Sequence, residues 1–146
     1  MPWVIKRSLY INITDFESLL LAAGQQAEPQ RLLFVFLQAL LSDDHDAEEA
    51  SRFHAGRGGH LKPVMCVDKA LDELDSFAGL VAESEDMGRA WDIVLLACLS
   101  GRNGINPDSA AVDEALKIML HTVESGGDLS KYMALDRNGV PLQFAW

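Results

Sequence analysis

The sequence predicts an α/β fold: a layered sandwich with a mixed sheet of about five to six strands, parallel at its centre, and about four helices. Short apolar runs alternate along the chain with segments of helical periodicity, and helix-capping patterns stand between them. An Asn-Gly pair near the C-terminus separates two further short runs. Because helical crossovers usually join strands of the same direction, the central strands are expected to be parallel, with α+β as the alternative.

The first two elements are predicted from alternation and from a cap. Ser8–Ile13 alternates apolar and polar residues, which indicates a short strand. Thr14 and Glu17 have the spacing of a capping box, so a helix is expected to begin there. Gly24 is placed to end this helix through a left-handed residue.

The middle of the chain is expected to supply the core strands. Leu32–Leu37 is apolar at every position, which is typical of a strand covered on both faces. The residues that follow change from acidic to basic, as in a short helix that ends near Gly56. Pro63 then opens a second strand over 64–67, and Trp91–Leu99 forms a third.

Two more helices are predicted from caps and apolar stripes. Asp75-Ser76 begins one helix, whose buried side carries Phe77, Leu80, Val81 and Ser84. Asn106–Ser109 supplies an N-cap and a first-turn proline for the longest helix, which ends at Gly126-Gly127. The buried stripe of that helix is Val112, Leu116, Met119, Leu120 and Val123.

The chain is expected to end in a hairpin. Asn138-Gly139 lies between two short apolar segments, as in a two-residue turn. Pro141 cannot donate to a neighbouring strand, so the last strand is expected at a sheet edge. No repeat or linker divides the sequence, and residues 1–146 are expected to form a single domain.

Composition excludes several classes of partner. The net charge of -10 and pI near 4.6 disfavour general nucleic-acid binding and binding to anionic membranes. No apolar run approaches the roughly 18 residues of a spanning helix, and Ser8–Thr14 is too short and polar for a signal-peptide core. Cys66 and Cys98 lie in apolar runs and are expected to be buried free thiols. These features predict a soluble, cytoplasmic protein.

The first candidate site is a basic, glycine-containing segment that precedes the second strand. Its candidate ligand-binding residues are Arg57, Gly58, Gly59, His60 and Lys62. Glycine amides approach an anion closely, and the basic side chains would add charge-assisted bonds. The spacing matches neither a Walker A loop nor a dinucleotide fingerprint. The alternative is a helix C-terminus followed by a flexible turn.

The second candidate is the turn Ser100–Gly104, which follows a buried strand. Arg102 and the amides at the next helix start would hold a carboxylate or a phosphate. The alternative is an ordinary connection between a strand and a helix. Asp68 and Lys69, expected just past the end of the second strand, would face the same edge as Arg102 and add polar groups there.

Cysteine and metal chemistry have little sequence support. Cys66 and Cys98 are expected on neighbouring strands, where two thiols would meet, but no histidine is fixed beside either as a base. The four histidines lack zinc-ligand spacing, and His121 falls opposite the apolar stripe of its helix. We therefore predict no metal, no cofactor and no catalytic residue.

Three segments resemble a family of short proteobacterial proteins without an established role: Glu28–Phe36, Ala55–Lys69 and Leu99–Arg102. The similarity runs from about Ile11 to the C-terminus. Some members carry the label of ribonucleotide reductase alpha subunit. Such a subunit needs a radical-bearing cysteine and a reducing cysteine pair, and two strand cysteines do not supply these parts. The resemblance therefore implies a family and no particular reaction.

Three functions follow as hypotheses. The first is a non-enzymatic binding domain that self-associates through apolar residues near the termini, namely Trp3, Val4, Phe144 and Trp146. The second is a protein that binds a small anion or nucleotide where the basic segment and the Arg102 turn converge. The third is a thiol-dependent enzyme.

Overall fold

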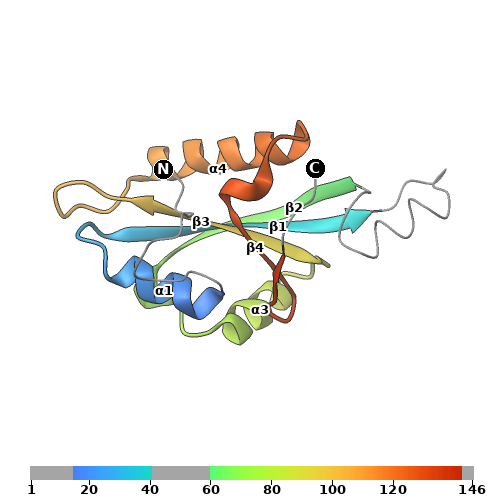
Figure 1. Cartoon of the computed structure of the whole chain (residues 1–146), viewed down its shortest axis with the longest axis horizontal. Coiled ribbons are helices and arrows are strands. Elements are labelled where there is room, and N and C mark those ends of the chain that lie inside the picture. The colour runs from blue at the N-terminus through green and yellow to red at the C-terminus, as the bar shows by residue number, and fades with distance from the viewer. Residues whose placement is uncertain (1–14, 41–59, 143–146) are drawn as a thin grey trace.

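The computed structural model describes residues 15–40 and 60–142, which form one five-stranded sheet with helices on both faces (Figure 1). The strand predicted at Ser8–Ile13, the helix predicted to end near Gly56 and the terminal aromatic residues lie outside these ranges. The α-helices are α1 (Phe16–Gly24), α3 (Phe77–Asp86) and α4 (Ser109–Glu124), with short 3-10 helices η1 (Leu71–Glu73) and η2 (Leu129–Lys131). The strands are β1 (Gln30–Leu40), β2 (His60–Ala70), β3 (Ile93–Ser100), β4 (Met133–Asp136) and β5 (Pro141–Leu142).

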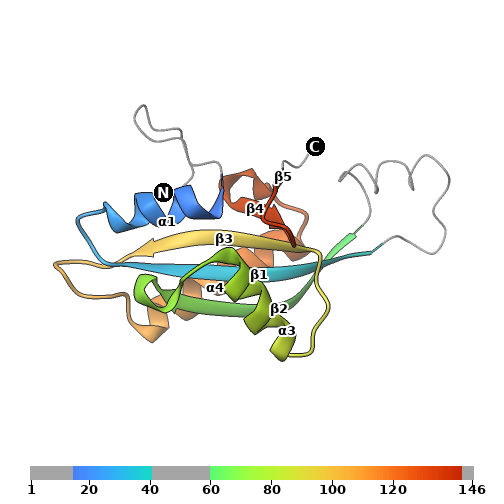
Figure 2. The same cartoon turned by 90° about the horizontal axis from the view of Figure 1, so that it is seen from below.

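The sheet is antiparallel throughout, so the prediction of parallel central strands is wrong. The strand order is β2-β1-β3-β4-β5, and every neighbouring pair is antiparallel. The crossover through α3 does join strands of the same direction, because β2 and β3 both run opposite to β1. However, β1 lies between them and separates the two parallel strands (Figure 2).

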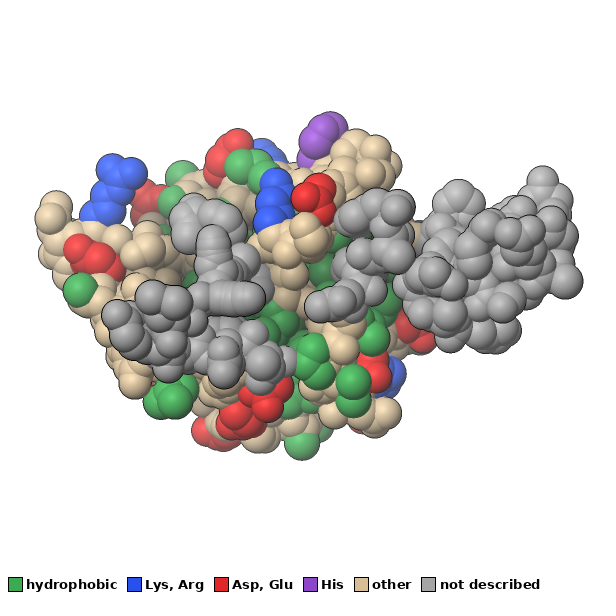
Figure 3. All heavy atoms as spheres, viewed as in Figure 1, with side chains coloured by type: hydrophobic (Ala, Val, Ile, Leu, Met, Phe, Trp, Pro, Cys, Tyr) green, Lys and Arg blue, Asp and Glu red, His purple; other side chains and the backbone are tan. Residues whose placement is uncertain are grey.

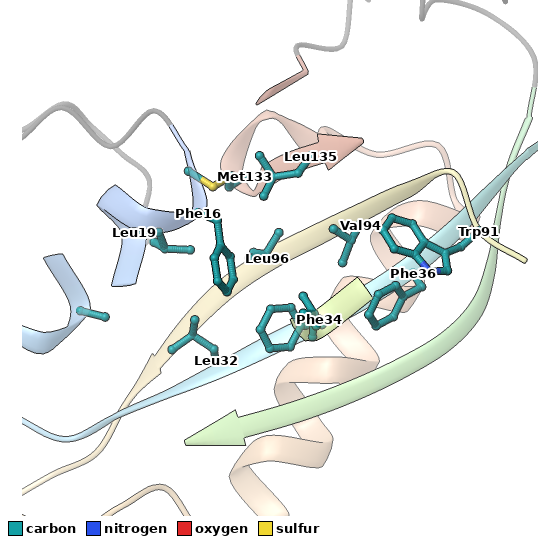
Figure 4. Packing of buried hydrophobic residues seen from close by; sticks show 12 residues of the cluster. Phe16, Leu19, Leu32, Phe34, Phe36, Trp91, Val94, Leu96, Met133 and Leu135 are labelled. Atoms are coloured by element: carbon teal, nitrogen blue, oxygen red, sulfur yellow. The ribbon is translucent and has the colours of Figure 1, made fainter. Parts of the chain in front are cut away.

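The all-apolar run in β1 is confirmed as the central core strand. Its even-numbered residues Leu32, Phe34 and Phe36 pack with α1 and α3, and the odd-numbered residues from Leu33 to Leu37 pack with α4. The α1 and α3 face is rich in aromatic rings, as Figure 4 shows. A strand between two covered faces has no solvent-exposed side, which explains the absence of polar alternation.

Trp91 lies just before β3 and closes one end of this core. Its ring contacts Phe36 edge-on, with the centroids 5.0 Å apart, and Arg137 stacks on it at 4.7 Å. The buried indole Nε1 donates to the Ser84 hydroxyl at 2.8 Å, and that hydroxyl donates to the Val81 carbonyl. Ser84, predicted on the buried side of its helix, is therefore buried with both hydrogen bonds satisfied.

The cap of α1 lies one residue later than predicted. Asp15 is the N-cap: its carboxylate accepts from the Ser18 amide at 2.9 Å, and the Ser18 hydroxyl accepts from the Asp15 amide at 3.0 Å. The same reciprocal box is thus built by a different pair, since Asp and Ser present oxygens at equivalent distances from the backbone. Gly24 is the last helical residue and lacks the left-handed conformation predicted for it.

The cap of α3 and the hairpin agree with the sequence, and the cap of α4 differs. Ser76 caps α3. Asp108 caps α4, so the prediction of a proline in the first turn is wrong, because Pro107 precedes the N-cap. Gly139 has a φ of 80° in the turn between β4 and β5, and β5 is an edge strand as predicted. No helix among the described residues combines the length and the apolar content that crossing a membrane requires.

Candidate functional site

The structure does not bring the two predicted basic segments together. Lys62 is exposed and lies opposite Gln38, whereas Arg102 follows Ser100, which lies opposite Gln30. Eight residues of β1 separate these positions, a distance of about 26 Å along a strand. Figure 1 shows the start of β2 and the loop after β3 at opposite ends of the sheet. Arg57, Gly58, Gly59 and the side chain of His60 lie outside the described residues.

The basic side chains of the described residues do not gather into a patch in the view of Figure 3, where they are spread over several places. His121 is exposed on α4, as predicted. No group of three His, Cys, Asp or Glu side chains in residues 15–40 and 60–142 is arranged to hold a metal ion.

The loop with Arg102 is a tight turn. Arg102 and Ile105 exchange two backbone hydrogen bonds of 3.0 and 2.9 Å, and Asn103 and Gly104 between them have positive φ. Positive φ at both central residues is typical of a type I′ turn, for which Asn-Gly is the preferred pair. The same Asn-Gly signal predicted the hairpin at Asn138-Gly139, but no such turn was predicted at Asn103-Gly104.

Glu28 occupies the amides of this turn. Its carboxylate accepts from the Asn103 amide at 3.1 Å and from the Gly104 amide at 2.8 Å. The carboxylate held here belongs to the chain itself, and it is bound by the turn amides, whereas the prediction named Arg102 and the amides at the next helix start. Nothing in the local sequence signals this pairing, because 75 residues separate Glu28 from Asn103.

Replacing Glu28 with alanine is expected to lower the free energy of unfolding by about 1 kcal/mol. The substitution removes two charge-assisted hydrogen bonds, whose effect is reduced because the turn amides are exposed to water. Urea denaturation of wild type, Glu28→Ala and Glu28→Gln measures the effect. Glu28→Gln keeps an acceptor and should lose less. Equal stability of all three proteins would contradict a role of Glu28 in holding the turn.

Asp68 and Lys69 lie inside β2, not past its end, and point to opposite faces of the sheet. Asp68 Oδ2 is 2.5 Å from Arg31 Nε, and Glu73 lies 3.9 Å from the same guanidinium on the α4 side. Lys69 forms an ion pair with Glu83 of α3. They lie at the same end of the sheet as Arg102, as predicted, but each has its own local partner.

The two thiols do not meet. Cys66 lies opposite Val35 on the α4 face, and Cys98 lies opposite Leu32 on the face of α1 and α3, with β1 between them. Cys98 is mostly buried, but Cys66 is exposed, so the prediction of two buried thiols is wrong for Cys66. The reason is that β2 is an edge strand.

Neither thiol is activated as a nucleophile. Burial raises the pKa of the Cys98 thiol to about 12. Partial burial, together with the carboxylates of Asp68 and Asp113, raises the pKa of the Cys66 thiol above its ordinary value. Both groups are therefore protonated at neutral pH, whereas a nucleophilic cysteine requires a lowered pKa.

Stability is expected to fall at alkaline pH because of Cys98. Its folded pKa of about 12 exceeds the ordinary value of 9.0, so the unfolded chain loses this proton first as the pH rises. The contribution is complete well below pH 9 and is lost between pH 9 and 12, with about 1 kcal/mol gone at pH 10. Urea denaturation at pH 8 and pH 10 tests this. Between pH 8 and pH 10, the Cys98→Ala variant should lose less free energy of unfolding than the wild type. Equal losses would contradict the assignment of this effect to Cys98.

The outer edge of β2 is free among the described residues. β2 has eleven residues, and within 15–40 and 60–142 its one neighbour in the sheet is β1. Pro63 and a bulge at Val64, where the register with β1 shifts, interrupt its first half. Such features protect edges from pairing. The second half, Met65–Ala70, contains neither a proline nor a bulge and spans about 20 Å.

A surface hollow adjoins this open half on the α3 side. It is small, with a volume of about 10 Å³, enough for about one water molecule, and lies between β2 and α3, next to Val67, Leu80 and Met87. The Lys69–Glu83 ion pair borders it. Met87 is 49% exposed, which is high for a large apolar side chain at the end of a helix. The hollow thus presents apolar atoms beside the unpaired strand edge.

The comparisons with known proteins do not identify a family. The chain matches no protein-family model, no curated protein and no solved structure. The family resemblance drawn from the sequence stays a prediction, and the function is argued from the geometry alone.

Proposed function

We propose that this protein is a non-enzymatic binding domain whose interaction element is the free edge of β2. The observation that carries the proposal is the eleven-residue outer strand with an uninterrupted second half, Met65–Ala70. An edge strand presents unpaired amides and carbonyls, and many domains bind an extended segment by adding it there as a further strand. The opposite edge, β5, has two residues and includes Pro141, which cannot donate.

The chemistry of the described side chains favours binding over catalysis. Cys66 and Cys98 have raised pKa values. Arg31, Asp68 and Lys69 are engaged in ion pairs within the fold. A strand edge, in contrast, binds through backbone groups and needs no activated side chain.

Titration with a neutral strand-forming peptide, acetyl-Ser-Val-Ser-Val-Ser-Val-amide, tests the proposal. Chemical-shift changes in a nuclear magnetic resonance spectrum are expected at Met65–Ala70 and not at Pro141–Leu142. The same peptide with every backbone amide N-methylated should have little effect, because it lacks the amides that pair with β2. Equal binding of the two peptides, or changes confined to other elements, would refute edge pairing.

A second copy of the chain is the occupant suggested by the sequence, and sedimentation decides whether it binds. Self-association through β2 should protect amides of Met65–Ala70 from hydrogen exchange as the protein concentration rises. A monomer at high concentration would exclude a second copy and leave other partners for the edge.

A small-anion site has less support from the geometry. Lys62 and Arg102 lie at opposite ends of the sheet, and Glu28 already holds the turn amides. Inorganic phosphate tests this function by thermal shift, since a ligand at a hundred times its dissociation constant stabilises by about 2.7 kcal/mol. A shift that Arg102→Ala abolishes would favour the anion site over the strand edge.

A further inference from the structure

We infer that the strand which pairs with β2 is basic on the side toward α4 and apolar on the side toward α3. The inference rests on the proposed function and adds the chemistry of the partner. Successive side chains of an added strand alternate between the two faces, so each face of β2 selects every second residue of the partner. The two faces of the sheet beside Met65–Ala70 differ in their charge and in their apolar surface.

The α4 face beside the open half is acidic. The carboxylates of Asp68 and Asp113 lie close enough to the Cys66 thiol to raise its pKa. Asp68 is paired with Arg31, but Asp113 has no cationic partner among the described residues. A lysine or arginine opposite Cys66 would find a carboxylate without having to break an existing ion pair.

The residues that follow the edge add a general negative field. Seven carboxylates and one lysine lie in residues 68–86, most of them in η1 and in α3, which lies on the other side of the sheet, and the lysine is held by Glu83. The whole chain carries a charge of -10. Charge complementarity of this kind increases the rate of encounter and selects a partner of opposite sign.

The α3 face beside the same residues presents apolar side chains at Val67, Leu80 and Met87, next to the Lys69–Glu83 ion pair. An added strand would direct alternate side chains toward the hollow at Val67 and Met87. Lys69 contributes no free charge on this face, because Glu83 neutralises it. Aliphatic residues are therefore favoured at the partner positions that face α3, where they remove apolar surface from water.

A second copy of the chain fits this pattern poorly. On the α4 face, the open half of β2 offers Cys66, Asp68 and Ala70, with no cation. Antiparallel pairing of two such edges would place the Asp68 and Asp113 carboxylates of both copies around the symmetry axis. Like charges at opposed positions are destabilising, whereas a basic strand neutralises them.

Two labelled peptides test the inference by fluorescence anisotropy: acetyl-Lys-Val-Lys-Val-Lys-Val-amide and its counterpart with glutamate at every lysine. At low salt, the lysine peptide should bind about tenfold more tightly than the glutamate peptide. This advantage should shrink at about 1 M salt, where the screening length is about 3 Å. Asp113→Asn should weaken the lysine peptide about threefold.

The control variant is Glu124→Gln, which removes one exposed carboxylate from the same helix, about 16 Å along the axis from Asp113. It should leave both affinities unchanged.

Equal affinity of the lysine and glutamate peptides, or equal effects of the Asp113→Asn and Glu124→Gln variants, overturns the basic partner while leaving edge pairing intact. An N-methylated lysine peptide that binds as well as the parent overturns edge pairing itself. If neither peptide binds, the inference is refuted, and dimerisation with protection of Met65–Ala70 would identify a second copy as the occupant.

Discussion

Replacement of Phe34 with alanine is expected to lower the free energy of unfolding by about 3–5 kcal/mol. Phe34 lies on the central strand with none of its surface exposed. Its ring stacks with Phe36 at a centroid distance of 6.5 Å, within the aromatic core shown in Figure 4. Removing the ring leaves a cavity. The two flanking strands and two helices cannot all move inward to fill it. Domains have about 5–15 kcal/mol of stability in total, so a large share would be lost.

Urea denaturation measures this loss, with Leu21→Ala as the matched control. Leu21 is an aliphatic residue of α1 that is 60% exposed, and its truncation should change stability by less than about 0.5 kcal/mol. If Phe34→Ala does not fold, Phe34→Leu, which keeps most of the apolar volume, should still show a measurable loss. Similar small effects at both positions would contradict a central position for β1.

Gly101→Ala is expected to destabilise the fold by about 2–3 kcal/mol. A Cβ atom at this position would lie 2.0 Å from the Ile105 carbonyl oxygen and 3.1 Å from a ring carbon of Pro29. The Gly101 amide also donates to the Pro29 carbonyl at 2.8 Å, which fixes the end of β3 against the start of β1. The closest clash is with the backbone of Ile105, so the turn that Glu28 holds would have to move.

Gly24→Ala serves as the opposite control. Nothing lies within 4 Å of a Cβ atom at Gly24, and the residue is helical. Alanine there should therefore stabilise by about 0.5–1 kcal/mol, because it reduces the freedom of the unfolded chain and favours the helix. Thermal or urea denaturation of both variants should give changes of opposite sign. A neutral Gly101→Ala would show that the loop does not approach Ile105 as closely as described.

The candidate site was predicted only in fragments. Asp68 and Lys69 were identified from the sequence, but as groups past a strand end that would bind an anion. The structure places them inside an edge strand, where each is paired with a residue distant in sequence. Nothing in the sequence marks Asp113 or Met87 as part of an interaction surface, because a carboxylate on a helix surface and a methionine at a helix end are common.

The sequence by itself determined the described helices to within a few residues and the C-terminal hairpin. Ser76 and the Asn138-Gly139 hairpin were identified correctly because capping and turn formation depend on neighbours within about four residues. The apolar run of β1 likewise specified a strand covered on both faces, since such a strand requires apolar residues at every position.

The tertiary structure decided the order of the strands and, with it, the exposed edge. Apolar runs show that strands pair but not with which neighbour, because backbone hydrogen bonds between strands are nearly independent of residue type. The insertion of β1 between β2 and β3 therefore has no sequence signal. That insertion makes the sheet antiparallel, separates Cys66 from Cys98, and leaves the second half of β2 open beside an acidic face.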